Sequence, residues 1–325
     1  MRVLVTGATG FVGGHLVPAL IERDHEVLAL VRPDRDASAL EALGARVIRG
    51  DVTDPVAVET AARGVETVVH LAVPRRVATL RHHRAVSVGG AENVMASARA
   101  AGVARIVHCS TVGVYGRLRS LPADEATPFR PETAYQVAKA EAEGVVQRHE
   151  RRHGAHVVVV RPTMVYGPGD LASLKLYRAI LSGRLLSVGR ASQPWQGVYV
   201  DDLVQALLLA LTTRDAVGES FVIADSGAIP QVDVFRAIAA AGGARLRRSV
   251  VPAWLVTAAV VPANAALRPL GRQAPFTKSL HFFTHPRSFD ISKAQRVLGY
   301  RPRVALEEGV RRTLAWYREQ GYVPR

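Results

Sequence analysis

A tyrosine and a lysine four residues apart, in the segment AYQVAKAE (134–141), could together carry out proton transfer. Of the 42 basic residues in the chain, 38 are arginine, so a lysine at position 139 calls for a reason. Positions i and i+4 lie on the same face of a helix, which makes Tyr135 and Lys139 neighbours there. A nearby ammonium favours the phenolate and lowers the phenol pKa from its usual value of about 10. A solvated surface pair is the alternative interpretation, so further signals are needed.

A glycine-rich turn near the start of the chain provides one such signal. Gly7, Gly10 and Gly13 follow an apolar stretch and precede a helix-like one, with the spacing G-x-x-G-x-x-G. Glycines so placed allow a tight turn, a close approach of the backbone to a pyrophosphate, and tight packing of the helix. The helix N-terminus then stabilises the anion. The turn predicts a dinucleotide site, with a glycine turn that binds no ligand as the alternative.

Strand-like and helix-like segments alternate along most of the chain. Continuous apolar strands separated by helices predict a parallel sheet covered on both faces, which is a doubly wound α/β (Rossmann) fold. We expect residues 1–166 to form the dinucleotide-binding domain, with a return contribution from about 196–225. Residues 167–325 are expected to form mainly a smaller C-terminal substrate-binding lobe over the carboxyl ends of the strands. The expected strands are 2–6, 26–31, 46–50, 66–72, 104–110, 156–162 and 221–225, and the expected helices are 11–23, 55–62, 84–101, 132–152, 171–182 and 201–213.

Composition excludes several classes of function. The net charge is +14, but the arginines are scattered and no run of five basic residues occurs, so we expect no nucleic-acid binding. The longest apolar stretch, 250–267, is broken by Pro252 and Pro262, so we expect no membrane insertion. The single cysteine, Cys109, excludes an internal disulfide and favours a reducing cytoplasm. We therefore expect a cytoplasmic protein with a small-molecule substrate.

The end of the strand 26–31 bears on the choice of cofactor. Versions of this fold that bind NAD usually place an acidic residue there to hold the ribose hydroxyls. Here Val31 takes that place and Arg32 follows, with Arg35 close behind. A 2′-phosphate would suit Arg32, so we expect NADP(H) to be preferred and NAD(H) to be possible. The alternative is a solvent-exposed arginine in an arginine-rich chain.

Six motifs occur in order along the chain: TGATGFVG, GDVTD, HLAV, HCSTVGVYG, YQVAK and VRPTMVYGPGD. This ordered set resembles the extended short-chain dehydrogenase/reductase family, part of the NAD-dependent epimerase/dehydratase superfamily, and the similarity continues to LGYRPRVALEEGV near the C-terminus. The resemblance implies that Thr111, Tyr135 and Lys139 are catalytic. Asp51 is placed for the adenine edge, although an N-cap is its alternative role. The expected cofactor-binding residues are Gly7, Thr9, Gly10, Phe11, Val12, Gly13, Arg32, Asp51, Val52, Leu71, Ala72, Val73, Ser110, Tyr135, Lys139, Pro162 and Val165.

The resemblance also bears on the substrate. Nucleotide-sugar epimerases and dehydratases of this family have an asparagine where this chain has Met164, and commonly an arginine where it has Trp195. Their replacement removes polar groups that hold phosphates and adds apolar surface. Together with the apolar section 250–270, this looks more like the 3β-hydroxysteroid dehydrogenase and dihydroflavonol reductase branches. The expected substrate-binding residues are Tyr115, Met164, Tyr166 and Trp195.

We therefore predict an oxidoreductase that acts on a ketone or alcohol of an apolar steroid-, flavonoid- or polyketide-like molecule. A nucleotide-sugar epimerase or dehydratase is the alternative. A catalytically silent cofactor sensor is disfavoured, because all three catalytic residue types are present. No metal site is expected, because the histidines at 82, 83, 149, 153, 281 and 285 show no spacing backed by carboxylates. The resemblance implies a homodimer through residues 84–101 and 132–152.

Overall fold

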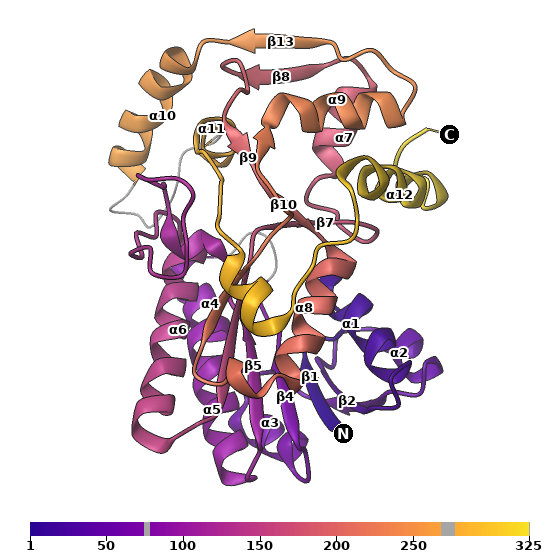
Figure 1. Ribbon diagram of the computed structural model, residues 1–325, viewed down its shortest axis with the longest axis vertical. Helices are drawn as coiled ribbons and strands as arrows, with labels where there is room; N and C mark the ends of the chain where they lie inside the picture. The colour runs from indigo at the N-terminus through magenta and orange to yellow at the C-terminus, as the bar shows by residue number, and fades with distance from the viewer. Residues whose placement is uncertain (75–78, 268–276, 325) are drawn as a thin grey trace.

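The protein is described by a computed structural model that covers residues 1–74, 79–267 and 277–324. Its central element is a sheet of seven parallel strands in the order β11-β6-β5-β4-β1-β2-β3 (Figure 1). This confirms the predicted doubly wound α/β fold. The strands are β1 (Arg2–Thr6), β2 (Glu26–Val31), β3 (Arg46–Arg49), β4 (Thr67–His70), β5 (Arg105–Cys109), β6 (Val157–Pro162) and β11 (Ser220–Ile223).

Helices cover both faces of the sheet. Along β1, Val3 and Val5 join the core under α1 (Phe11–Ile21) and α8 (Val200–Thr212). The residue between them, Leu4, faces α3 (Pro55–Ala62), α5 (Gly90–Ala100) and α6 (Ala134–His153) on the other side. Both faces are therefore buried, which explains why the strands read as continuous apolar runs. The short helix α2 (Ser38–Ala42) lies between β2 and β3 in the sequence.

One segment predicted as a single helix is divided in the structure. The segment expected as a helix over 84–101 is α4 (Leu80–His83), a π-helical turn η1 (Arg84–Gly89) and then α5. A side chain at Gly90 would meet Val52 at 3.0 Å, so glycine there lets the helix approach the loop after β3. The helix expected over 132–152 begins at Ala134, because Thr133 and Gln136 form a capping box around its first turn.

The remaining elements form a second core above the carboxyl ends of the strands (Figure 1). Three strand pairs contribute: β7 with β10, β8 with β13, and β9 with β12. These strands are β7 (Met164–Tyr166), β8 (Leu185–Val188), β9 (Pro194–Trp195), β10 (Gly197–Tyr199), β12 (Ile229–Pro230) and β13 (Arg248–Val251). The helices are α7 (Leu174–Leu181), α9 (Gln231–Ala241), α10 (Ala253–Leu267), α11 (Thr277–Thr284) and α12 (Leu306–Glu319).

The chain returns to the sheet layer twice after β7. The first return brings α8, the 3-10 turn η3 (Arg214–Ala216) and β11, all within or next to residues 196–225. The second return places Phe289, Ile291 and the π-helical turn η5 (Ala294–Leu298) in the same core as β1, and no sequence pattern predicted it. Among the helices of the described residues, none has both the length and the apolar character needed to cross a bilayer.

Candidate active site

The glycine turn after β1 is held so close to β4 that side chains do not fit. Gly7 has φ +74°, and a Cβ there would lie 2.9 Å from the backbone of Leu71 and Ala72. A Cβ on Gly13 would lie 2.4 Å from the carbonyl oxygen of Gly7, so α1 packs directly on the turn. Gly10 is the N-cap of α1 and has no side chain to occupy the amide groups of the first turn. The turn therefore presents free backbone and a helix N-terminus, which suits a pyrophosphate.

A cavity of about 140 Å³ opens at this turn. Its lining includes Arg32 and Arg35, and Arg32 is partly exposed with an ion pair to Asp34 at 3.1 Å. The expected cofactor residues on its wall are Gly7, Thr9, Gly10, Arg32, Asp51, Val52, Leu71, Ala72 and Val73. Asp54, not Asp51, caps α3 by accepting a hydrogen bond from the Val56 amide.

The other expected cofactor residues lie outside this cavity wall. Phe11 packs edge-on against His15, and Val12 packs against the core under α1. Gly13 lies beneath the turn, Pro162 ends β6, and Ser110, Val165, Tyr135 and Lys139 lie along the same carboxyl edge of the sheet.

The three expected catalytic residues come together at the carboxyl end of β5. Thr111 follows the strand directly, and its hydroxyl accepts a hydrogen bond from the Gly113 amide at 3.0 Å. The Thr111 hydroxyl lies near the Tyr135 phenol, where it favours the ionised form of the phenol. Lys139, one turn further along α6, is 2% exposed, and its Nζ donates to the Cys109 carbonyl oxygen at 2.6 Å. The hydroxyl, the phenol and the ammonium thus surround one end of a strand.

Burial controls the charges at this site. Burial raises the pKa of Tyr135, and the neighbouring Thr111 hydroxyl only partly opposes this effect. Burial also lowers the pKa of Lys139, against the attraction of Glu143. In the protein alone the Tyr135 pKa is raised because burial dominates, so the expected lowering by Lys139 together with the charged nicotinamide ring stays a prediction for the cofactor complex. At neutral pH Tyr135 is a protonated phenol, which is a proton donor.

Comparison with known proteins places this arrangement in a family. The model of the NAD dependent epimerase/dehydratase family matches residues 3–224. The chain belongs to this family. It is therefore an NAD-dependent enzyme of the short-chain dehydrogenase/reductase type, as the ordered motifs predicted.

Individual members of the family are similar over almost the whole chain. The 2-alkyl-3-oxoalkanoate reductase of Stenotrophomonas maltophilia (strain K279a) is 32% identical, with 97% of this chain and 99% of the relative covered. The 3 beta-hydroxysteroid dehydrogenase/Delta 5→4-isomerase of Mycobacterium tuberculosis (strain ATCC 25618 / H37Rv) is 30% identical, with 97% and 90% covered. The solved structure of MoeE5 in complex with UDP-glucose and NAD has a TM-score of 0.78 and 27% identity, with 98% and 99% covered.

A buried ion pair lies next to the expected catalytic residues, and the sequence analysis missed it. Glu143 on α6 is fully buried and pairs with Arg161 of β6 at 2.6 Å. Ser110 donates its hydroxyl hydrogen to Glu143, and Arg161 also donates to the Tyr115 hydroxyl at 2.9 Å. Because the Ser110 hydroxyl donates its hydrogen to Glu143, Thr111 is the hydroxyl residue that lies beside Tyr135. The available signal was the position of Glu143, four residues after Lys139 on the same helix face.

The expected substrate residues are mostly buried. Tyr115 is 1% exposed, and its hydroxyl accepts a hydrogen bond from Arg161 of the buried ion pair. Tyr166 is 4% exposed and packs against Trp195 in the upper core. Trp195 lines a separate cavity of about 420 Å³ together with Asp225. Met164 is half-buried on β7, so among these four residues it retains the clearest access to a ligand.

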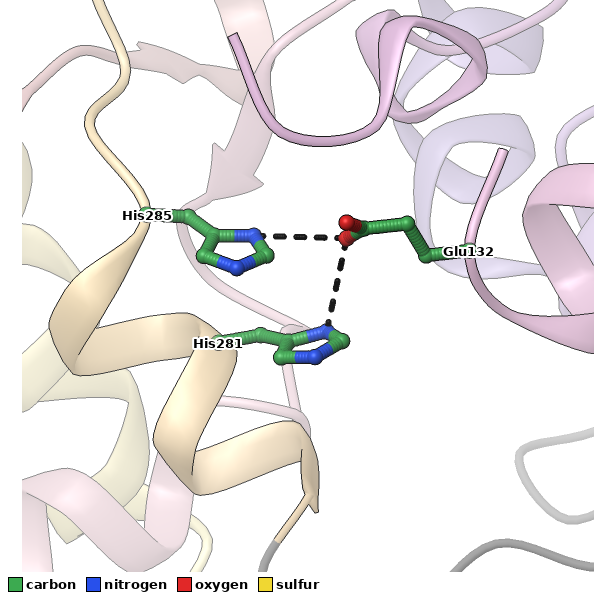
Figure 2. Close-up of side chains that lie close together, drawn as sticks. All are labelled: Glu132, His281 and His285. Atoms are coloured by element: carbon green, nitrogen blue, oxygen red, sulfur yellow. Dashed lines mark ion pairs between the residues drawn. The ribbon is translucent and has the colours of Figure 1, made fainter. Parts of the chain in front are cut away.

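The structure also brings together three side chains that the sequence analysis did not join into a site. His281 and His285, from α11 and the residue after it, approach the Glu132 carboxylate just before α6 (Figure 2). The expectation of no metal site considered histidine spacing with local carboxylates, whereas Glu132 comes from a distant part of the sequence. The signal was the i, i+4 spacing of the two histidines.

Proposed function

We propose that the chain reduces a ketone, or oxidises the corresponding alcohol, on an apolar small molecule of steroid, flavonoid or polyketide type. The observation that carries this proposal is the position of Thr111 and Tyr135 beside the buried Lys139, at the edge of the sheet where the glycine turn lies. Hydride chemistry at a carbonyl needs one proton donor held at the reacting oxygen, and Tyr135 is that donor in the proposal.

Each residue of the three has a distinct role in this proposal. Tyr135 donates its proton to the substrate oxygen during reduction and accepts it back during oxidation. Thr111 hydrogen-bonds Tyr135 and the same oxygen, which fixes the position of the reacting group. Lys139 is held by the Cys109 carbonyl, and from there it would hydrogen-bond the ribose of a bound nicotinamide cofactor. When bound, the nicotinamide cofactor supplies or accepts the hydride.

We propose further that NADP(H) is preferred over NAD(H). Arg32 and Arg35 both line the cavity at the glycine turn, and the Val31 side chain beside them is apolar. A guanidinium fork binds a phosphate by two parallel hydrogen bonds, which a ribose hydroxyl does not match. The neighbouring Asp34 is the competing partner of Arg32, so the 2′-phosphate would have to displace an exposed ion pair.

An apolar substrate is supported by the relatives and by the surface of the upper lobe. One relative is named as a reductase of 3-oxoalkanoates and another as a dehydrogenase of hydroxysteroids. The predicted apolar section 250–270 forms the end of β13 and the helix α10, while residues 268–270 lie outside the described part. Trp254, Leu255 and Val261 on α10 are exposed, and together they form an apolar surface on this lobe.

A second candidate function is a nucleotide-sugar epimerase or dehydratase. The observation in its favour is a cavity of about 710 Å³ lined by three arginines, Arg117, Arg119 and Arg130, on the loop that precedes α6. Arginines so grouped can bind the phosphates of a nucleotide-sugar even though Met164 and Trp195 offer no polar contact.

Activity with two substrate panels separates the two candidates. The purified protein is incubated with NADPH or NADH and with fused-ring or long-chain ketones, or with UDP- and dTDP-sugars and NAD⁺. We expect oxidation of the reduced cofactor with apolar ketones only. Turnover of a nucleotide-sugar without any ketone reduction would replace the first candidate by the second.

We propose that the protein acts as a homodimer in the cytoplasm. The family resemblance suggests contact through α5 and α6, and the single cysteine fits a reducing compartment. Light scattering coupled to size-exclusion chromatography should give twice the chain mass of 35.0 kDa. A mass of one chain at micromolar concentration would contradict the dimer.

A further inference from the structure

Glu132, His281 and His285 form a compact group between the two parts of the molecule. Glu132 lies just before the helix that carries Tyr135, whereas His281 lies on α11 of the upper lobe and His285 directly follows that helix. Among the described residues, this is the one group of three or more histidine, cysteine or acidic side chains whose donor atoms all lie within 4.8 Å of one another. Figure 2 shows the two rings lying one above the other, each with a nitrogen turned toward the carboxylate.

The distances are close to those that a metal ion requires. His285 Nδ1 is 3.5 Å from Glu132 Oε2, and His281 Nδ1 is 3.9 Å from the same oxygen. Around a tetrahedral zinc ion, with ligands at 2.0–2.1 Å, donor atoms lie about 3.3 Å apart. Small side-chain shifts therefore bring all three donors onto one ion. The two rings already stack with centroids 4.3 Å apart, and the His285 amide donates to the His281 carbonyl, so helical spacing holds them together.

The protonation of the histidines suits coordination. Burial lowers the pKa of His285, with smaller contributions from His281, Arg287 and Arg117, to about 4 in all. Burial also lowers the pKa of His281, while Glu132 opposes this effect. Both rings are thus neutral near pH 7 and can use their lone pairs to bind a metal.

The same arginines determine which metal fits. Arg117 and Arg287 repel a cation that is held by charge alone, as Mg²⁺ and Ca²⁺ are held by oxygen ligands. Zinc and similar ions form strong bonds to imidazole nitrogen, so two rings and one carboxylate offset this repulsion. Side chains of Glu132, His281 and His285 are 35%, 25% and 15% exposed, so solvent reaches the group.

We propose that Glu132, His281 and His285 bind one divalent transition-metal ion of the zinc class. Three protein ligands leave a fourth position open for water or an anionic group, and the adjoining arginine-lined cavity is the space from which that group arrives. The ion ties α11 to the start of the catalytic helix. This inference does not depend on the proposed reaction, since its test measures binding and not turnover.

The test uses the full chain without an affinity tag, after treatment with a chelator. Zinc is titrated by calorimetry, and cobalt is used as a second probe because its visible absorption reports the coordination geometry. We expect one ion per chain and a rise in the thermal unfolding temperature with zinc but not with magnesium. Glu132→Gln and His285→Gln should each weaken zinc binding by about tenfold or more, as expected for a lost ligand interaction.

A matched control lies at the other end of α6. His149 and His153 share the i, i+4 spacing, and His149 Nε2 lies 2.8 Å from the Glu92 carboxylate. These three side chains nevertheless do not bring all their donor atoms within 4.8 Å of one another. His149→Gln should leave zinc binding unchanged. Absence of a saturable ion, or equal binding by Glu132→Gln, His285→Gln and the wild-type chain, would overturn the proposal. If Glu132→Gln does not fold, His281→Gln replaces it in the same comparison.

Discussion

At the scale of single residues, Tyr135 is the group with the most direct chemical consequence. Its phenol holds its proton at neutral pH because burial raises its pKa, so the cofactor-free site can donate a proton but has no ready base. Tyr135→Phe should lower turnover by about 10²–10⁴-fold, the range for loss of a general acid or base. The affinity for the cofactor should stay close to wild type. Steady-state kinetics and fluorescence titration of the reduced cofactor measure the two effects.

The control for this change is a tyrosine far from β5. Tyr322 lies after α12, and Tyr322→Phe should leave turnover unchanged. Near-normal activity of Tyr135→Phe, or equal losses in the two variants, would remove Tyr135 from the proposed mechanism.

Arg32 determines the expected cofactor preference. Loss of its guanidinium removes a charge-assisted hydrogen bond to the 2′-phosphate, which is worth about 1.5–3 kcal/mol. Arg32→Ala should therefore reduce the preference for NADPH over NADH by roughly 10- to 100-fold in dissociation constants. Arg63→Ala, an exposed arginine on the end of α3, is the control and should not change the ratio. An unchanged ratio of the two dissociation constants in Arg32→Ala would show that Arg32 is a surface residue that does not contact the cofactor.

Residues close together in the sequence were predicted better than residues joined only by the fold. Tyr135 and Lys139 could be paired from one helix spacing, and their shared location with Thr111 followed from the order of motifs. The partner of Glu143 could not be predicted, because Arg161 lies on a strand and meets the helix only through tertiary packing. The contact between Glu132 and His281 could not be predicted for the same reason, because the two residues lie far apart in the chain.

At the scale of elements, α1 contains two adjacent glycines whose replacement by alanine should have opposite effects on the stability of the protein. A Cβ at Gly13 would meet the Gly7 oxygen at 2.4 Å and the Ala8 Cα at 2.7 Å, whereas a Cβ at Gly14 meets nothing within 4 Å. Gly13→Ala should destabilise the protein by about 1–3 kcal/mol through overpacking. Gly14→Ala should stabilise it by about 0.5–1 kcal/mol through helix propensity. Urea unfolding measures both, and equal effects would contradict the packing of α1 on the turn.

The contact between α6 and β6 depends on the buried pair of Glu143 and Arg161. Removing one partner leaves the other charge uncompensated, so Glu143→Gln should cost about 3–5 kcal/mol of unfolding free energy. The matched control is Glu141→Gln on the same helix, whose pair with Arg84 is exposed and screened. The double variant Glu143→Leu/Arg161→Met should recover much of the loss, because an apolar pair of similar volume is tolerated. Equal costs for the two single variants, measured by chemical denaturation, would contradict this view.

The strands of the sheet could be predicted to within one or two residues because each one is a short apolar run between turn signals. The observed β1 and β2 match their expected ranges, and β11 begins one residue before its expected start. The upper lobe was less predictable. Its strands are two to four residues long, and β8 pairs with β13 across a long sequence separation. Such pairs are stabilised by the surrounding core and carry little pattern of their own.

At the scale of the whole molecule, the lower and upper parts meet around the end of β11. The Asp225 amide donates to Gly197, and its carbonyl accepts a hydrogen bond from Gln196. Nearby, Asp202 accepts hydrogen bonds from the amides of Arg303 and Val304. Two carboxylates thus lie at the junction of α8, β11 and the segment that leads into α12. Their mutual repulsion makes the junction sensitive to pH.

Burial, reinforced by the charge of Asp202, raises the pKa of Asp225 to about 7. Below about pH 4 both the folded and the unfolded chain hold this proton, so the group contributes no pH dependence. Between about pH 4 and pH 7 the unfolded chain has released the proton while the folded chain retains it. Fewer protons are then bound in the unfolded state, so the free energy of unfolding falls as pH rises. Above pH 7 both states are ionised, and the full cost of burying the charge remains.

Asp225→Asn should remove this dependence. Between pH 5 and pH 8 the unfolding temperature of the wild-type chain should fall by about 2–5 °C relative to that of the variant. Asp215→Asn is the matched control, because it removes the same charge from an exposed position and should follow the wild-type curve. Differential scanning calorimetry at constant ionic strength compares the three curves. Parallel curves for Asp225→Asn and wild type would show that the Asp225 carboxylate is ionised in the folded protein over this whole range, and that the junction is more hydrated than its burial implies.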